Sequence, residues 1–137
     1  MPSFELKPIG RVESPLNDLE LAPRQADEGA PGAWLVFEPE VLEALQNISP
    51  GDKIIVVTWL DRARRDVLSV HPRGDTFRAK EGVFSTRSPH RPNPIGLHQV
   101  EITAIDGGRV TVRRLEALDG TPIIDVKPLL IEDICLR

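Results

Sequence analysis

The sequence predicts a mainly β protein: a single antiparallel β-barrel or sandwich with one short helix. Short apolar stretches recur along the chain and are joined by turns, and only one stretch has the periodicity of a helix. This pattern is typical of antiparallel sheets and not of alternating β–α units. At 137 residues the chain is long enough for one domain, so we expect a single domain over residues 1–137 with about six or seven strands.

The first two strands are separated by a long loop. Residues Phe4 to Val12 predict the first strand, and Pro8 places that strand at a sheet edge or marks a bulge. Residues 14–32 are rich in proline, glycine and acidic side chains and lack apolar periodicity, which indicates a loop. Residues Ala33 to Phe37 predict the second strand.

A short helix is predicted over residues Pro39 to Gln46. Proline suits the first turn of a helix, because the amide that it lacks would have no partner there. The apolar stripe of this helix consists of Val41, Leu42, Leu45 and Ile48. The Pro50-Gly51 pair ends it.

Residues Lys53 to Leu60 predict the strongest strand. Both of its faces are apolar, so we expect it to be central and covered on both sides. Its end places Trp59, Asp61 and Arg62 at a rim of the sheet. The Asp106-Gly107-Gly108 segment predicts a hairpin turn later in the chain. The remaining strands are predicted over Val67–Val70, His98–Ile105, Arg109–Leu115, Thr121–Val126 and Leu129–Leu136.

Composition limits the classes of function. The net charge of −4 argues against a generally basic nucleic-acid coat, although a local basic patch remains compatible with it. A single cysteine, Cys135, allows no intrachain disulfide and fits a reducing cytoplasm. No apolar stretch approaches the length of a membrane span. The three histidines are far apart and no paired cysteines accompany them, so we expect no metal site.

The segment from Gly82 to Leu97 predicts a stiff loop. It contains three prolines, each of which fixes its own φ angle and disfavours helix in the residue before it. Stiffness suits a loop that must hold a ligand at low entropic cost. The side chains displayed along it are Arg87, Ser88, His90, Arg91 and Asn93. A rigid connector with solvated arginines explains the same residues about equally well.

The motif Thr-Arg-Ser-Pro-His-Arg-Pro-Asn-Pro-Ile-Gly-Leu at residues 86–97 resembles the signature of the TsaA-like family. This is the TrmO-type, or YaeB-like, family of S-adenosylmethionine-dependent tRNA methyltransferases. Further matching segments are Pro8-Ile9-Gly10 with Ser14-Pro15, Pro23-Arg24-Gln25, Leu118 to Pro122, and Asp125 to Pro128. The resemblance spans nearly the whole chain and implies a β-barrel that binds S-adenosylmethionine and works as a homodimer.

The resemblance also implies where the cofactor binds. Arg87 or Arg91 could hold the carboxylate of the cofactor with a bidentate pair of hydrogen bonds. Relatives have an aromatic residue followed by histidine where this chain has Leu60-Asp61, so it departs from the family there. The candidate cofactor-binding residues are Pro23, Arg24, Gln25, Asp61, Arg62, Arg87, Ser88, Arg91, Asn93, Leu97, Leu118, Asp119, Gly120, Thr121 and Pro122.

Asp125 and Lys127 are the candidate catalytic residues. They lie two positions apart and so share one face of a strand. Methylation of an exocyclic amine needs a polar group that orients the amine and receives its proton. The other interpretation is a surface ion pair that contributes under about 1 kcal/mol. Leu129 stands where the family normally has tyrosine, so any role of that ring is lost.

Arg64, Arg65 and Arg73 are the candidate RNA-binding residues. The first two belong to a charged run that could contact phosphates, although a solvated charged turn fits the run equally well. The chain has no tyrosine. Bases would therefore stack on Trp34, Trp59, Phe84, His90 or an arginine plane.

The resemblance implies a tRNA (adenine-N6)-methyltransferase acting on threonylcarbamoyladenosine next to the anticodon. Two alternatives stay open: a methyltransferase of a small molecule or another RNA, and a non-catalytic module that binds the cofactor or RNA. The residues alone do not point to the cofactor, because the Gly-x-Gly-x-x-Gly fingerprint of dinucleotide sites is absent.

Overall fold

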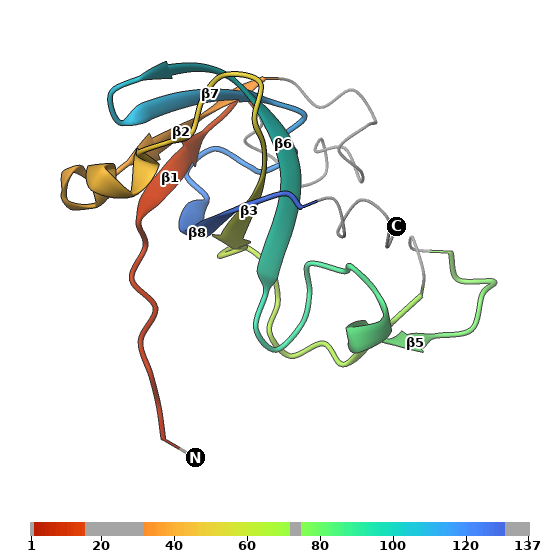
Figure 1. Ribbon diagram of the computed structural model, residues 1–137. Coiled ribbons are helices and arrows are strands. Elements are labelled where there is room, and N and C mark those ends of the chain that lie inside the picture. Colours follow the sequence, from red (N-terminus) through yellow and green to blue (C-terminus); the bar gives the residue numbers. More distant parts are fainter. Residues whose placement is uncertain (1, 16–31, 72–74, 131–137) are drawn as a thin grey trace.

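Six strands form a closed antiparallel barrel in the computed structural model, which describes residues 2–15, 32–71 and 75–130 (Figure 1). Around the barrel the order is β1-β2-β7-β6-β3-β8, and β8 pairs back onto β1. The strands are β1 (Gly10–Glu13), β2 (Ala33–Phe37), β3 (Lys53–Trp59), β6 (Ile95–Asp106), β7 (Arg109–Arg113) and β8 (Pro122–Pro128). A separate ribbon consists of β4 (Ser69–Val70) and β5 (Glu81–Gly82). The predicted mainly β, antiparallel architecture is confirmed.

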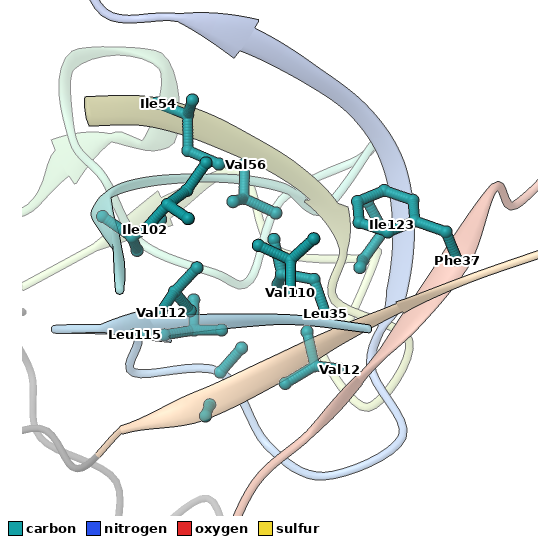
Figure 2. Close-up of a cluster of buried hydrophobic side chains, with 13 residues drawn as sticks. Val12, Leu35, Phe37, Ile54, Val56, Ile102, Val110, Val112, Leu115 and Ile123 are labelled. Carbon is teal, nitrogen blue, oxygen red and sulfur yellow. The ribbon is translucent and has the colours of Figure 1, made fainter. Parts of the chain in front are cut away.

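Alternate side chains of each strand fill the barrel (Figure 2). In β2, Ala33, Leu35 and Phe37 are buried, whereas Trp34 between them is exposed. This period of two follows from the pleat, which sends successive side chains to opposite faces. The core includes Val12, Leu35, Ile54, Val56, Val100, Ile102, Val110, Val112, Leu115 and Ile123.

The first strand begins at Gly10, so the prediction that it begins at Phe4 is wrong. Phe4 and Leu6 are 84% and 48% exposed, since none of the described strands pairs with them. Gly10 is the first residue of β1 that pairs with both β2 and β8. A Cβ atom at Gly10 would collide with the backbone oxygen of Val36. β1 and β2 therefore approach this closely because Gly10 has no side chain.

The predicted helix is present as a 3₁₀ helix over Pro39–Leu45. Glu38 before it makes no side-chain capping hydrogen bond, and no residue of the helix is fully buried. Val41 and Leu45 nevertheless pack partly against the core. A second 3₁₀ turn, Val83–Ser85, lies at the start of the proline-rich segment. Short elements with few buried contacts are typical of 3₁₀ geometry.

The later strands differ from prediction mainly at their ends. β6 begins at Ile95 and not at His98, directly after the last proline of the motif. β7 ends at Arg113 because Arg114 has a φ of 70°, which an extended strand cannot accommodate. Leu129 and Leu130 lie outside β8, and the rest of the last predicted strand lies outside the described residues.

β3 is central, as predicted, because it pairs with both β6 and β8. Its inner residues Ile54, Val56 and Thr58 are buried. Its outer residues are only half-buried, so the predicted cover on both faces is not met within the described part of the chain. None of the described helices is long and apolar enough to cross a bilayer.

Candidate functional site

Arg91 holds the proline-rich loop in shape from inside. Its Nη1 donates to the carbonyl oxygens of Thr86 at 3.1 Å and Ser88 at 3.0 Å. Its Nη2 donates to the carbonyl oxygen of Val83 at 3.0 Å. The prolines remove amide donors, and Arg91 supplies donors to the Thr86 and Ser88 carbonyls; the Val83 carbonyl also accepts from the amide and hydroxyl of Thr86. Arg91 therefore closes the loop and has fewer donors left for the cofactor role predicted for it.

The loop lies against the charged turn that follows β3. The amide of Leu60 donates to the carbonyl of Pro94 at 2.7 Å, and the amide of Arg91 donates to the carbonyl of Arg64 at 3.1 Å. The amide of Arg64 donates to Nδ1 of His90 at 3.0 Å. In each of these hydrogen bonds the turn contributes a backbone atom. The bonds therefore hold the turn against the loop independently of the turn's side chains.

Arg65 fastens the same junction. Its Nε donates to the carbonyl of Pro92 at 2.7 Å and its Nη2 to Oδ1 of Asn93 at 2.9 Å. Its Cζ also lies 5.1 Å from the centre of the Trp59 ring. Arg65, a predicted RNA contact, and Asn93, a predicted cofactor contact, thus make contacts within the chain.

Arg64 pairs with Asp66 at the exposed edge of this turn. Its Nε and Nη2 donate to the two carboxylate oxygens of Asp66, each at 3.0 Å. These hydrogen bonds and the opposite charges raise the pKa of Arg64 and lower the pKa of Asp66. The charge of Arg64 is therefore partly offset before any RNA phosphate arrives. Arg73 lies outside the described residues.

Arg87 is the side chain that the loop presents outward. It is exposed and has no hydrogen bond or ion pair with another described residue. By contrast, Oγ of Ser88 accepts from the amide of His90 at 3.3 Å and so serves the loop. A charged side chain on a stiff support is the arrangement that suits capture of a carboxylate.

Strand register brings several predicted residues onto one outer face of the barrel. Leu97 on β6 pairs with Val57 on β3, and Val57 pairs with Asp125 on β8. Leu97 is 51% exposed and lies two strands, or about 10 Å, from Asp125. Lys127 Nζ lies 3.1 Å from Asp125 Oδ2, so the two share a face, and both are well exposed. Asp61 and Arg62, also exposed, follow the end of β3.

The turn before β8 holds its own shape. The amide and Oγ1 of Thr121 both donate to the carbonyl of Leu118, at 3.1 and 2.7 Å. Gly120 has a φ of 84°, which favours glycine, and its amide donates to the carbonyl of Val12 at 2.7 Å. Leu118 and Thr121 are buried, so only Asp119 and Gly120 face solvent there, with Pro122 half-buried beside them.

Asp119 and Gly120 form one side of a groove of about 590 Å³. Asp119 Oδ1 accepts from the amide of Ser14 at 3.0 Å. The groove is lined by Arg11, Val12, Glu13, Ser14, Pro15, Gly32, Trp34, Asp119 and Gly120. Arg11 and Glu13 were not predicted, since nothing in their spacing marks them. Trp34 was predicted as a residue on which bases could stack, because the chain has no tyrosine.

A buried histidine lies near the start of β6. His98 Nε2 lies 2.8 Å from Thr58 Oγ1, and Nδ1 has no hydrogen-bond partner among the described residues. Burial lowers the pKa of His98 to about 4, so the ring is neutral near pH 7. In the described part of the chain, no cluster of histidine, cysteine and acidic side chains could hold a metal ion.

The predicted cofactor residues therefore fall into three groups. Arg87, Asp61, Arg62 and Leu97 are exposed around the loop and β6. Asp119 and Gly120 line the groove, and Pro122 lies half-buried beside them. Ser88, Arg91, Asn93, Leu118 and Thr121 support the loops. Pro23, Arg24 and Gln25 lie outside the described residues.

Comparison with known proteins gives consistent matches. Residues 11–133 match the model of the tRNA-methyltransferase O N-terminal domain. An S-adenosyl-L-methionine-binding protein of Archaeoglobus fulgidus is 45% identical over 132 residues, covering 96% of this chain and 94% of that protein. A probable S-adenosyl-L-methionine-binding protein of the same organism is 43% identical over 90% of this chain, which spans only 33% of that protein.

The fold also matches solved structures. A crystal structure of TrmO from Pseudomonas aeruginosa superposes with a TM-score of 0.75 and 26% identity. The match covers 94% of this chain and 57% of that one. The chain thus spans little more than half of the solved protein.

Proposed function

This chain belongs to the tRNA-methyltransferase O N-terminal domain family, and we propose that it methylates threonylcarbamoyladenosine next to the anticodon of tRNA, on the exocyclic amine. Its cofactor is S-adenosylmethionine. The observation that carries the proposal is the loop of residues 86–94, which is closed by Arg91 and presents Arg87 outward.

The residues present suit this cofactor. Arg87 offers a cation for the carboxylate, and Leu97 offers an apolar surface on the adjoining strand. Gly120 leaves its backbone open to close approach, as an adenine ring requires. When bound, the cofactor supplies a methyl group on a good leaving group, so the chain's task is to align and orient.

Asp125 is proposed to receive the proton of the amine, directly or through water. Its carboxylate is half exposed and lies on the outer face that carries Leu97. Lys127 Nζ, at 3.1 Å, pairs with that carboxylate and orients it. The exposed arginines of the turn after β3, with Arg73, are proposed to meet RNA phosphates.

Removing the Arg87 side chain should weaken cofactor binding without unfolding the loop. Arg87→Ala loses one charged hydrogen-bonding group, which is worth about 2–3 kcal/mol. Titration calorimetry with S-adenosylmethionine measures the change. Arg78→Ala, another exposed arginine, is the matched control and should bind like the wild type. Equal affinity of Arg87→Ala and wild type would remove Arg87 from the site.

We propose further that the chain is a homodimer formed through the outer face of β3 and β6. On this face Val57 pairs with Leu97, and Trp59 pairs with Ile95. Ile95 and Leu97 are 42% and 51% exposed, so two exposed apolar side chains lie next to each other on one face at the start of β6. Asp125 and Lys127 at its edge suit a two-fold related copy, because each chain presents both charges.

Light scattering at micromolar concentration should give the mass of a dimer. Ile95→Glu should give a monomer, because it places a charge in the apolar contact. Leu6→Glu, at a comparably exposed residue away from this face, should stay dimeric. A monomer mass for the wild type would contradict the proposed assembly.

A second candidate function is a cofactor-binding module without turnover. The loss of tyrosine at Leu129 favours it. Methyl incorporation into bulk tRNA would distinguish a tRNA methyltransferase from a binding module. Incorporation into small molecules only would favour a small-molecule methyltransferase. A cytoplasmic location, suggested by the single cysteine, stays a prediction.

A further inference from the structure

Trp34 is an aromatic side chain on the outer face of the barrel. It is 38% exposed, although the residues on either side of it are buried. The Cζ atom of Arg109 lies 4.8 Å from the centre of its ring. The Trp34 ring is not part of the core, so we infer its role from the groups around it.

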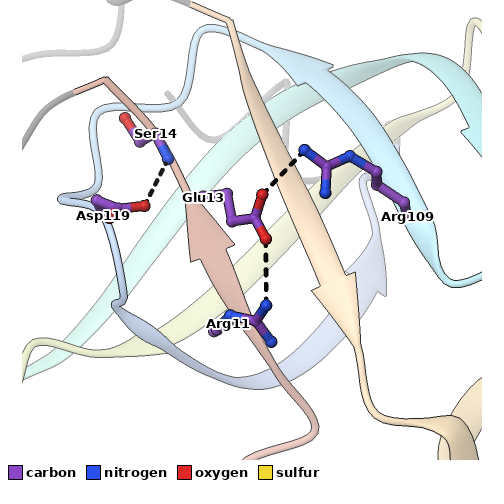
Figure 3. A network of polar contacts seen from close by, with 5 residues as sticks. All are labelled: Arg11, Glu13, Ser14, Arg109 and Asp119. Atoms are coloured by element: carbon purple, nitrogen blue, oxygen red, sulfur yellow. Dashed lines mark hydrogen bonds and ion pairs between the residues drawn. The ribbon is translucent and has the colours of Figure 1, made fainter.

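Glu13 fixes this stack. It accepts from Arg109 Nη2 at 2.9 Å through one carboxylate oxygen and from Arg11 Nη2 at 3.2 Å through the other (Figure 3). Arg109 is therefore held over one face of the Trp34 ring. The indole is already oriented before any ligand arrives, which lowers the entropic cost of stacking.

Trp34 lines the groove of about 590 Å³. That volume is in the range of sites for small ligands. Gly32, two residues before Trp34, also lines the groove and contributes no side chain to fill it. Asp119 and Gly120 line the groove too, so it adjoins the turn assigned to the cofactor.

Asp119 is the acceptor that the groove leaves available to a ligand that donates hydrogen bonds. Glu13 is also a carboxylate, but its two oxygens already accept from Arg109 and Arg11, and Arg11 itself lines the groove. Asp119 Oδ1 takes one backbone amide, and its other oxygen has no hydrogen bond with a described residue. An exocyclic amine on a flat ring could donate to Asp119 while the ring stacks on the indole.

We propose that this groove takes an unpaired base of the RNA, one that carries an exocyclic amine, stacked on Trp34 beside the cofactor turn. This inference rests on the proposed function and adds the side chains that would select the base. Stacking on aromatic rings is the usual way in which single-stranded bases are held. Trp34 and Arg109 act here as positioning residues.

The fluorescence of Trp34 gives a direct test. The chain has two tryptophans, so Trp59→Phe leaves Trp34 as the single reporter. A short oligoadenylate RNA should quench this reporter, and oligouridylate, whose base lacks an exocyclic amine, should quench it far less at the same concentration. Equal quenching by the two would overturn the choice of base.

Substitution tests the energetic part. Trp34→Leu should weaken oligoadenylate binding roughly tenfold, and Trp34→Phe should keep most of the affinity. Arg109→Gln should weaken it as well. Arg113 lies on the same strand as Arg109 and makes a similar ion pair, at 2.8 Å, with Glu101. Arg113→Gln is therefore the matched control and should bind within about twofold of wild type.

Three further outcomes separate this inference from the proposed function. If Trp34→Leu binds RNA like the wild type while the wild type methylates tRNA, the inference alone is overturned. If Trp34→Leu weakens S-adenosylmethionine binding as much as RNA binding, the groove belongs to the cofactor and the inference is again overturned. A wild type that binds S-adenosylmethionine but neither binds nor methylates RNA overturns both.

Discussion

Gly10→Ala is expected to lower the free energy of unfolding by about 3 kcal/mol or more. The new Cβ atom would collide with the carbonyl oxygen of Val36 and lie 3.0 Å from Cα of Phe37. Both are backbone atoms of β2, so no side-chain rotation can relieve the contact. β1 would have to separate from β2 at the point where it also pairs with β8.

Urea denaturation measures this change. Gly82→Ala is the matched control, because Gly82 has a φ of −61° and its Cβ atom would have only Leu68 O, at 4.0 Å, nearby. The control should keep wild-type stability. A Gly10→Ala variant as stable as the control would mean that the barrel does not close as tightly as described.

Arg91→Ala is expected to lower stability by about 2–4 kcal/mol and to abolish measurable cofactor binding. Its half-buried guanidinium satisfies the carbonyl oxygens of Val83, Thr86 and Ser88, and each would lose a charged donor. The loop would lose its shape, and Arg87 would lose its fixed position.

The comparison with Arg87→Ala separates support from contact. Arg87→Ala should lose affinity but keep the wild-type urea midpoint, whereas Arg91→Ala should lose both. Arg91→Lys should recover only part of the loss, because one ammonium cannot match the geometry of the three acceptors. Wild-type stability of Arg91→Ala would show that the prolines hold the loop without it.

Short apolar runs with clear boundaries could be predicted from the sequence. Ala33–Phe37 has the predicted bounds because all five residues are apolar, a glycine precedes them, and Glu38-Pro39 follows. The start of β6 was placed too late, since Ile95 and Leu97 follow a proline motif that reads as loop and point outward. Gly10 shows the converse case: its close approach to β2 depends on pairing that the sequence does not state.

The candidate site was predicted only in part. The loop was predicted as stiff, but Arg87 and Arg91 are chemically alike and only the fold shows which one serves the carbonyls. Likewise, Arg109 reaches Trp34 through the pairing of β2 with β7, which brings distant parts of the chain together. Residue type predicts the chemistry of a side chain, whereas strand pairing determines which side chains contact one another.

The most direct test of the proposed function is mass analysis of nucleosides from tRNA incubated with the protein and S-adenosylmethionine. We predict a methylated threonylcarbamoyladenosine with the wild type and almost none with Arg87→Ala at the same cofactor concentration. The absence of any new methylated nucleoside, with a wild-type protein that binds S-adenosylmethionine, would contradict the assignment as a tRNA methyltransferase.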